Sequence, residues 1–419
     1  MKQIILLLLL SIAINIPASF SQKATKADQL LYSEQYSKAI PMLEQMIKKD
    51  SLNSLLYFQL GKAFQNLNKD KLAIINYQKA NSLNNNSKTI LLNLSSCLYS
   101  LGNYPGAEKY LSNLHSIDSS DYQVNLLLAK TLSGQNKLKE SLKIYKQIIQ
   151  TDSLNPFIYK QIGNLKDRMQ NFTGSLSSYM ISYELNPDDL SVLVHIIQQL
   201  YEMAAYQQAL EYCSKGLATY PDNTILLKKK AQVLIGLEWY DNALTILKDL
   251  KASNNLTDAE HRQLGICYMQ TRQYEDALTA FASCGPTFDK DPMINFHTGI
   301  CYARLNQHEK GIKFLEDALF YITSPIEASM HLYLAKSYGA TRQFEKATAS
   351  YLNLIEIDNT NPDILYEIAT TYEEYGENKD KALDYYTKFL QQTSDIDDPK
   401  YEYAKSRILH IKEILHFGR

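Results

Sequence analysis

The feature that most constrains the fold of this chain is a series of small residues at a fixed interval. Alanine, serine or glycine recurs at nine positions with one constant spacing, and a second such series, interrupted only by Ile197, precedes the first by a constant offset. The first series is Ala39, Ala73, Ala107, Ser141, Ser175, Ala209, Ala243, Ala277 and Gly311. The second is Ala27, Gly61, Ser95, Ala129, Gly163, Ala231, Gly265 and Gly299. Two antiparallel helices approach closely only where neither carries a bulky side chain. The interval therefore predicts a row of helical hairpins.

Large side chains follow the small ones at helical spacing. Four residues after most members of the first series stands a large apolar or aromatic residue: Leu43, Tyr77, Leu111, Tyr145, Tyr179, Leu247, Phe281 and Leu315. Such a stripe is typical of a buried helix face. Glycine and proline, which end helices, number only 15 and 11 among 419 residues, which argues against loop-rich sandwiches and glycine-rich nucleotide folds. The pattern predicts an all-α protein.

Two segments also carry the early part of a known repeat pattern. Leu60 and Gly61 are followed three residues later by Phe64, and Gly265 is followed in the same way by Tyr268. In these residues, and in its 34-residue period, the sequence resembles the tetratricopeptide repeat family. The resemblance implies a right-handed α-solenoid, a superhelix of antiparallel helix hairpins with about eleven repeats and a C-terminal capping helix.

The boundaries of the array follow from where the period begins and loosens. Ala347 and Ala382 continue the first series after Gly311, but each follows at a slightly longer interval than the period. We expect the repeats to occupy residues 22–392 and a linker with the capping helix to occupy residues 393–419. Apolar residues in that tail recur at spacings of three and four, as in one amphipathic helix: Tyr401, Ala404, Ile408, Ile411 and Leu415.

Residues 1–21 differ in composition from the repeats. Lys2 precedes an apolar run from Ile4 to Ile16, and small residues follow at Ser19 and Ser21. This three-part pattern is typical of a secretory signal peptide with cleavage after Ser21. An uncleaved anchor is the alternative, although the apolar run is short for a membrane span. We therefore expect an exported bacterial protein of the periplasm, the outer membrane surface or the extracellular space, without a stable membrane span after cleavage.

The sequence offers little for catalysis. It has none of the common phosphate-loop, zinc-protease or serine-nucleophile motifs, and after the repeats are assigned no segment is long enough for a catalytic domain. The cysteines are not spaced as metal ligands, and we interpret them as small buried residues, with one oxidised pair among the last three as the alternative: Cys97, Cys213, Cys267, Cys284 and Cys301. A formal charge of −2 argues against nucleic acid. We predict a chain that is not an enzyme and has no cofactor or metal.

Candidate binding residues come from the family resemblance. In that family the first helix of each hairpin faces the concave groove, and the corresponding positions here include Lys130, Phe157, Lys160, Asn164, Arg168, Lys228, Arg262, Phe296, Arg304 and Lys336. Cations beside apolar side chains suit an acidic peptide or a C-terminal carboxylate. Lys160 and Asn164 match part of the family's carboxylate clamp, but His195 stands where the clamp has asparagine. A solvated surface is the alternative interpretation of these charges.

The function predicted from these observations is that of a non-catalytic scaffold or adaptor of the bacterial cell envelope. It would bind peptide or protein segments in its concave groove. A glycan-binding accessory protein is the alternative, since Tyr99, Phe157 and Tyr201 are placed where rings could stack on sugars.

Overall fold

The computed structural model describes residues 25–85, 87–285, 291–320, 326–375, 378–394 and 398–417. The predicted signal peptide, residues 1–21, and its cleavage site lie outside the described residues. Within them the regular structure consists of 23 α-helices and no strand, as the sequence predicts. None of the helices in these ranges is both long and apolar enough to cross a membrane.

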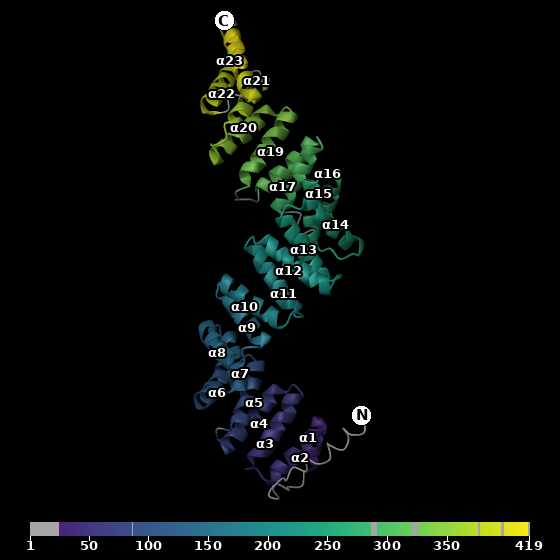
Figure 1. The fold of residues 1–419 in the computed structure, drawn as a ribbon, viewed down its shortest axis with the longest axis vertical. Coiled ribbons are helices and arrows are strands. Elements are labelled where there is room, and N and C mark those ends of the chain that lie inside the picture. Colours follow the sequence, from purple (N-terminus) through teal and green to yellow (C-terminus); the bar gives the residue numbers. More distant parts are fainter. Residues whose placement is uncertain are drawn as a thin grey trace, which may run out of the picture. The chain divides into compact units, whose positions relative to one another are not determined.

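The helices fall into two compact units, the first ending at Val192 and the second beginning at Leu193. The first unit contains α1 (Lys26–Tyr32), α2 (Tyr36–Lys49), α3 (Ser54–Asn66), α4 (Asp70–Leu83), α5 (Lys88–Ser100), α6 (Tyr104–Ile117), α7 (Tyr122–Gly134), α8 (Leu138–Thr151), α9 (Pro156–Arg168), α10 (Phe172–Leu185) and the first residues of α11 (Leu190–Glu202) (Figure 1).

The second unit begins within α11 and continues to the last helix. It contains α12 (Tyr206–Thr219), α13 (Thr224–Gly236), α14 (Tyr240–Ala252), α15 (Asp258–Gln270), α16 (Tyr274–Ala282), α17 (Pro292–Arg304), α18 (His308–Phe320), α19 (Glu327–Ala340), α20 (Phe344–Ile357), α21 (Asp363–Tyr375), α22 (Lys379–Gln392) and α23 (Pro399–Phe417). Taken in order, the described helices form eleven hairpins, from α1 with α2 to α21 with α22, followed by α23.

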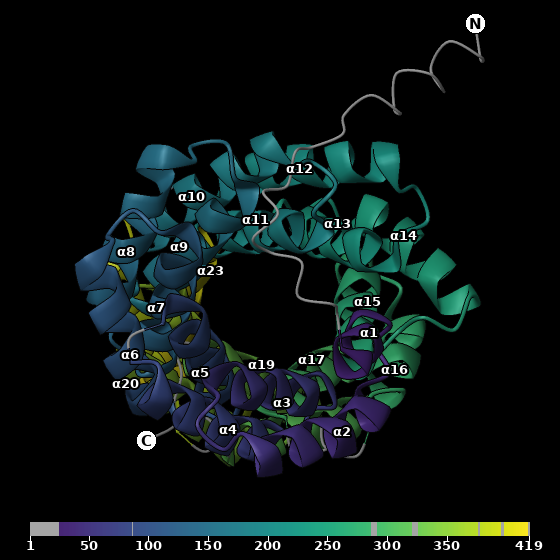
Figure 2. The same ribbon diagram turned by 90° about the horizontal axis from the view of Figure 1, so that it is seen from below.

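The odd-numbered helices of each unit line one side of the stack. Successive odd helices contact one another, α3 with α5 and α5 with α7 in the first unit, and α13 through α19 in the second. In the first unit, Figure 2 shows α4, α6 and α8 outside α3, α5 and α7. We call the side formed by the odd-numbered helices of a unit its first-helix face.

The two series of small residues lie at the crossing inside each hairpin, as predicted. Members of both series are buried. The hydroxyl of Ser141 donates to the carbonyl oxygen of Ala129 at 2.7 Å, and that of Ser175 donates to the carbonyl oxygen of Gly163 at 2.9 Å. A side chain at these positions can therefore be little larger than a hydroxymethyl group, because the opposite backbone is in contact.

Each small residue on a first helix also faces a large residue on the second. A Cβ atom added to Gly61 would lie 2.8 Å from the ring of Tyr77, and one added to Gly163 would lie 2.8 Å from the ring of Tyr179. The hairpin that breaks the small series reverses the sizes, since Ile197 occupies the first-helix position and Cys213 the second-helix position, both fully buried. Summed volume is thus conserved across the crossing, as close packing requires.

The turn inside most hairpins has one residue in the left-handed backbone conformation. In chain order these residues are Glu34, Asn68, Gly102, Asn136, Gln170, Ala204, Glu238, Arg272, Asn306 and Arg342, with φ between 56° and 74°. The chain then reverses through a bond such as that from the N–H of Asn103 to the carbonyl oxygen of Leu98, at 2.9 Å. This arrangement closes a helix C-terminus and satisfies its last carbonyl groups.

The last helix, α23, covers the open side of α22. Ala404 and Ile411 are buried there, and Arg407 is paired with Glu373 of α21. Lys400 pairs with Asp363, also on α21, at 2.5 Å. A helix that buries one face and pairs its charges with the preceding hairpin supplies the end of the stack, because the last apolar face of an array must be covered.

Candidate binding site on the first-helix face

All ten candidate residues lie on odd-numbered helices. In the first unit α7 carries Lys130, and α9 carries Phe157, Lys160, Asn164 and Arg168. In the second unit the carriers are α13, α15, α17 and α19, with Lys228, Arg262, Phe296, Arg304 and Lys336. Their placement on one type of helix agrees with the sequence analysis, but the surroundings of the individual side chains differ.

Several candidates of the first unit are engaged by their own chain. The ammonium group of Lys130 lies 5.2 Å from the centre of the Phe157 ring. Arg168 donates to the Ser133 hydroxyl at 2.7 Å, and Asn164 accepts a hydrogen bond from the buried Tyr179 at 2.6 Å. Asn164, expected as part of a carboxylate clamp, therefore serves to hold the tyrosine at a hairpin crossing.

Three of the candidate cations are neutralised by carboxylates on the next repeat. Lys160 pairs with Asp189 at 2.8 Å. Lys228 pairs with Glu260 at 3.0 Å, and the guanidinium of Arg262 lies 3.5 Å from a carboxylate oxygen of Asp291. Three of the seven candidate cations are thus offset, because each of these three meets an acid at the start of the next first helix.

These carboxylates also cap the helices that carry or follow them. Asp189 accepts hydrogen bonds from the backbone N–H groups of Ser191 and Val192 at 3.1 and 3.2 Å, just before α11. Burial raises the pKa of Asp189, but hydrogen bonds from Lys160, Ser191 and Val192 outweigh this effect and hold the pKa below its usual range. A carboxylate at a helix N-terminus is stabilised by the unpaired N–H groups and the helix dipole. One residue therefore both starts a repeat and ties it to the repeat before.

Glu260 combines the same two roles in the second unit. Its side chain accepts a hydrogen bond from the backbone N–H of Thr257 at 2.8 Å, which completes a capping box at the start of α15. Burial raises the pKa of Glu260, but the bonds from Thr257 and Lys228 outweigh it and leave the pKa lowered. The acid is held ionised opposite its lysine.

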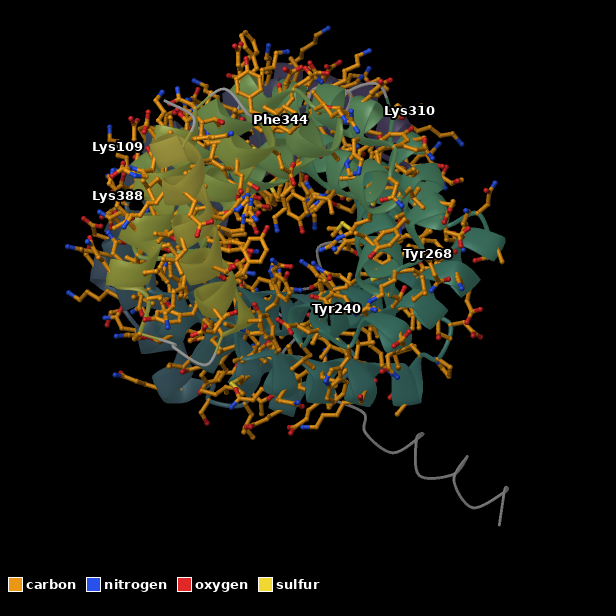
Figure 3. All side chains as sticks on the ribbon, turned by 90° about the horizontal axis from the view of Figure 1, so that it is seen from above. Lys109, Tyr240, Tyr268, Lys310, Phe344 and Lys388 are labelled. Carbon is orange, nitrogen blue, oxygen red and sulfur yellow. The ribbon has the colours of Figure 1, made fainter. Side chains whose placement is uncertain are left out.

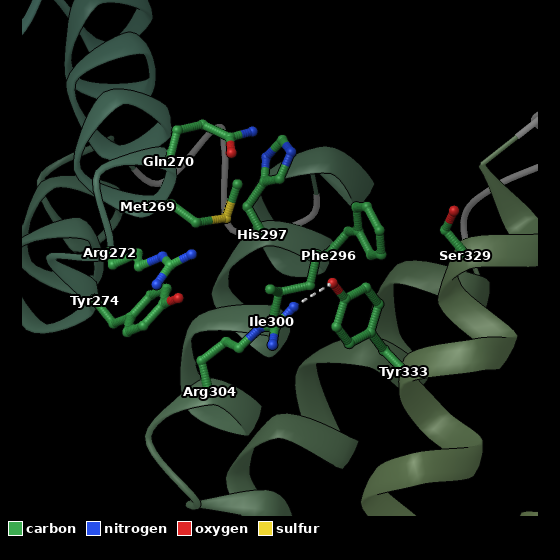
Figure 4. Close-up of a pocket in the computed structure, with 10 residues that line it drawn as sticks. All are labelled: Met269, Gln270, Arg272, Tyr274, Phe296, His297, Ile300, Arg304, Ser329 and Tyr333. Atoms are coloured by element: carbon green, nitrogen blue, oxygen red, sulfur yellow. Dashed lines mark hydrogen bonds between the residues drawn. The ribbon is translucent and has the colours of Figure 1, made fainter. Parts of the chain in front are cut away.

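A pocket of about 660 Å³ opens on the first-helix face of the second unit, between α15, α17 and α19 (Figure 4). In Figure 4, Arg272 and Tyr274 approach it from one side, Ser329 and Tyr333 from the other, and the residues of α17 lie between them. Its lining residues are Met269, Gln270, Arg272, Tyr274, Phe296, His297, Ile300, Arg304, Ser329 and Tyr333.

The aromatic side chains of the pocket are held in place by ring contacts. Phe296 is only 7% exposed and packs edge-to-face with Tyr333, with ring centres 6.2 Å apart. Arg304 lies 5.9 Å from the centre of the Tyr333 ring and donates to its hydroxyl at 3.4 Å. Stacked guanidinium and aromatic groups keep the charge in a fixed position without neutralising it.

His297 is the titratable group of this pocket. Its ring stacks on Phe281 at 6.0 Å and is tilted against Phe296 at 5.6 Å. Burial lowers the pKa of His297 to about 4, and the nearby charge of Arg262 adds to the shift, while Asp291 opposes it. Its buried Nδ1 atom has no hydrogen-bond partner in the described part of the chain. The imidazole is therefore neutral at physiological pH, and it lines the pocket with its Nδ1 atom buried away from solvent.

Sequence reasoning found Phe296 and Arg304 but missed most of the pocket. Arg272 belongs to the turn between α15 and α16, and Tyr274, His297 and Tyr333 have the aromatic spacing of packing residues. The only sequence signal was indirect: Arg272 occupies the left-handed turn position, which places an exposed side chain beside the first-helix face.

The features expected for other chemistry are not assembled. No group of three or more histidine, cysteine, aspartate or glutamate side chains that could hold a metal occurs in the described ranges. The five cysteines are buried and unbonded, and burial raises the pKa of Cys267 and Cys301 to about 12. Tyr99 and Tyr201, considered for sugar stacking, each contact an aromatic ring of the following helix, with ring centres 5.4 and 5.3 Å apart.

A chain of stacked helical hairpins with side chains presented along its first helices is a helical-repeat protein of the solenoid class. Residues 55–87 and residues 363–392 each match a family model described as the tetratricopeptide repeat. These two segments of the chain are therefore similar to tetratricopeptide repeats.

Similar proteins come from several kinds of organism. The chain is 21% identical over 220 residues to the TPR repeat-containing protein YpiA of Bacillus subtilis, covering 52% of this chain and 49% of that protein. It is 22% identical over 282 residues to the Hsp70-Hsp90 organizing protein of Triticum aestivum, covering 58% and 48%. For the intraflagellar transport protein 70A of Danio rerio the identity is 23%, covering 36% and 23%. The chain thus spans about half or less of each of these relatives.

Solved structures are also similar to the chain. The hetero-tetramer Cut9-Hcn1 of the APC/C matches with a TM-score of 0.41 and 14% identity, over 92% of this chain and 96% of that one. A tetratricopeptide repeat protein from Parabacteroides merdae matches with a TM-score of 0.40 and 14% identity, over 62% and 98%.

Proposed function

We propose that this chain is a non-catalytic scaffold that holds segments of partner proteins on its first-helix face. The family supports this, because stacked hairpins expose a long surface and bind extended or helical segments along it. The names of two relatives point the same way, one an Hsp70-Hsp90 organizing protein and another the anaphase-promoting complex subunit CDC16 of Saccharomyces cerevisiae.

The observation that carries the proposal is the exposure of apolar side chains at a repeated place on this face. Phe157 on α9 and Ile225 on α13 each occupy the second position of a first helix, and they are 39% and 56% exposed. On the same two helices, Lys160 and Lys228 are held in place by ion pairs with carboxylates of the next repeat. Exposed apolar groups among oriented charges suit recognition of a protein segment better than isolated charges would.

Site-specific photo-crosslinking in cells that produce the chain tests this proposal. A photoreactive phenylalanine analogue replaces Phe157 or Ile225 on the first-helix face, and in matched controls it replaces Lys109 of α6 or Lys388 of α22. Figure 3 shows Lys109 and Lys388 at the outer rim of the helices that carry them. We expect crosslinked partner proteins from the two first-helix positions and few from the controls. Equal crosslinking from both sets, or from the controls alone, would contradict the proposed face.

We also propose that the scaffold is exported to a bacterial cell envelope, in the periplasm, at the outer membrane or outside the cell. The support is the sequence of residues 1–21, with its cationic start, apolar run and small residues before Gln22. N-terminal sequencing of the protein from fractionated cells tests it. The expected mature chain begins at Gln22, and a Leu8→Arg variant should keep its N-terminus and remain in the cytoplasm. A wild-type chain that retains Met1 in the cytoplasm would overturn this part of the proposal.

A further inference from the structure

The pocket between α15, α17 and α19 is lined by two arginines without a carboxylate partner among the described residues. Lys160, Lys228 and Arg262 each have a carboxylate partner, whereas neither Arg272 nor Arg304 forms an ion pair with any residue in the described ranges. Both arginines are exposed, and no described carboxylate lines this pocket. Two guanidinium groups without a carboxylate partner among the described residues therefore line one cavity.

Carboxylates stand nearby but belong to an adjoining pocket. Glu238 and Asp241 line a second cavity of about 650 Å³, which shares Gln270 and Arg272 with the first. No ion pair joins either acid to Arg272 among the described residues. Arg272 therefore stands between a cavity with acids and one without, and Arg304, on α17, is partnered among the described residues by the phenol group of Tyr333.

The wall behind the two arginines is apolar. Phe296 and Ile300 are buried and Met269 contributes a flexible thioether, so the cavity joins a cationic rim to an apolar base. Tyr274, Gln270 and Ser329 add neutral hydrogen-bonding groups around it. Guanidinium groups bind carboxylates in a planar, two-point manner, and an apolar base accepts a side chain next to the charge.

Resting on the proposed function, we propose that this pocket is the point on the scaffold where a partner protein is specified, and that it takes an acidic residue adjacent to a large apolar residue in an extended segment. Arg272 and Arg304 bind the carboxylate, and the space over Phe296, Ile300 and Met269 takes the neighbouring side chain. The site lies in the second unit and uses a turn residue, so it is distinct from the clamp positions Lys160 and Asn164.

The ring contacts favour a peptide over an acidic sugar. Sugars are bound by open aromatic faces, but the ring of Tyr333 has Arg304 5.9 Å from its centre and Phe296 packed against it nearly at a right angle. Phe296 itself is 7% exposed, so it forms the base of a cavity rather than a platform. A side chain that enters from a peptide fits such a base, and the flanking peptide backbone can continue along α17 and α19.

Selection from a library of 12-residue peptides displayed on phage, with the full-length chain as the target, tests the proposal. We expect selected peptides to share an aspartate or glutamate next to a leucine, phenylalanine or similar residue. A selected peptide labelled with fluorescein then serves as the probe for fluorescence polarisation. Its affinity should fall at least about tenfold in the double variant Arg272→Ala and Arg304→Ala, and also on raising the salt concentration.

Two further variants separate the site from general effects. Arg342 is exposed and has the same turn position in the hairpin of α19 and α20, so Arg342→Ala removes an equivalent charge outside the pocket and should leave the affinity within about twofold. Ser329→Trp fills the cavity from α19 without changing charge and should abolish binding. Unchanged thermal unfolding of each variant shows that the fold is retained.

The outcomes distinguish this inference from the proposed function. Peptides that bind tightly without an acid, or that are insensitive to the arginine and Ser329 variants, would overturn the assigned pocket while leaving the scaffold proposal standing. Arginine-dependent binding of oligogalacturonate in place of peptides would show an acidic glycan site and overturn it as well. If no peptide and no partner protein is captured on the first-helix face, both proposals fail.

Discussion

At the scale of single residues, the distance between the two helices of a hairpin is set by one facing pair of residues, of which one is small and the other large. A glycine or alanine on the first helix makes room for a tyrosine, phenylalanine or leucine on the second, as Gly163 does for Tyr179. Tyr179 is fully buried and its hydroxyl is bonded to Asn164, so the ring cannot move aside. The small residue is therefore needed to make room for the large side chain that faces it, and not only to let the two helix backbones approach.

Replacing Gly163 by alanine tests this dependence. Alanine favours a helix over glycine by about 1 kcal/mol, but its Cβ atom would lie 2.8 Å from the fixed ring of Tyr179. Because overpacking of a buried site costs about 1–3 kcal/mol, we expect the variant to lose up to about 2 kcal/mol of unfolding free energy net. Urea denaturation followed by circular dichroism measures the change.

Gly339 provides the matched control. It also lies in a first helix, α19, but a Cβ atom there would meet no other atom within 4 Å. Gly339→Ala should therefore gain up to about 1 kcal/mol from helix propensity alone. Equal effects of the two substitutions would show that the ring of Tyr179 does not determine the residue at position 163.

His297 makes a second prediction at this scale, on pH dependence. Its pKa is about 4 in the folded chain, below the unfolded value of about 6.5, so the unfolded chain binds the proton more readily between these values. Folding stability contributed by the neutral ring is therefore complete above pH 6.5 and falls as the pH drops from 6.5 to 4, by on the order of 3 kcal/mol. Denaturation curves across this range should show the decline.

The variant His297→Phe keeps a ring between Phe281 and Phe296 and removes the titratable group. Its stability should change less than that of the wild type between pH 6.5 and 4. His410, an exposed residue of α23, supplies the control, and His410→Asn should follow the wild-type curve. A wild-type curve that is flat in this window would refute the burial of a neutral His297.

Much of this packing is predictable from the sequence, because it repeats. The small residues and their large partners recur with the hairpins, so Gly61 and Tyr77 predict what Gly265 and Phe281 do. Ile197 interrupts the series of small residues on the first helices, but the residue that faces it on the second helix, Cys213, is correspondingly small. The side-chain size that one crossing position allows depends on the residue that faces it on the other helix.

At the scale of helices, neighbouring repeats are joined by side chains that cap one helix and pair with another. Asp291 accepts hydrogen bonds from the N–H groups of Met293 and Ile294 at the start of α17, while Arg262 of α15 reaches its other oxygen. These bonds could not be foreseen from residue types alone. The capping acid is recognisable in the sequence, but the cation that reaches it is determined by the stacking of two hairpins.

The turns between paired helices make a prediction of their own. Ala204 lies between α11 and α12 with a φ of 56°, a conformation that costs a residue with a Cβ atom about 1–2 kcal/mol. Glycine adopts it freely but gives the unfolded chain more entropy, worth about 0.4–1 kcal/mol. We therefore expect Ala204→Gly to raise the unfolding free energy by about 0.5–1 kcal/mol, measured by urea denaturation.

Ala349 is the control for this substitution. It is exposed in the interior of α20, where glycine lowers helix stability by about 1 kcal/mol relative to alanine. The two alanine-to-glycine changes should thus have opposite signs. If Ala204→Gly destabilises the chain as Ala349→Gly does, the left-handed turn is absent in solution.

At the scale of the whole molecule, the chain is two units built from the same kind of element. Each hairpin contacts mainly its neighbours along the sequence, so the first-helix face can vary from repeat to repeat without a change of fold. This explains why the class of fold is evident from the sequence while the pocket is not. Arg272, Phe296 and Tyr333 come from three different hairpins, and only the stack shows that they share a cavity.

The claim on which the account depends is that these hairpins are interchangeable units stacked in register. Deleting residues 138–171 removes one full repeat and joins α7 to α10, so that Ala129 faces Tyr179 where it had faced Tyr145. Deleting residues 138–154 removes only the second helix, α8, and places two first helices in succession. Circular dichroism at 222 nm during thermal unfolding compares both with the wild type. The account predicts that the full-repeat deletion keeps the wild-type helicity per residue and a cooperative transition, whereas the half-repeat deletion loses both; equal loss in the two deletions would contradict it.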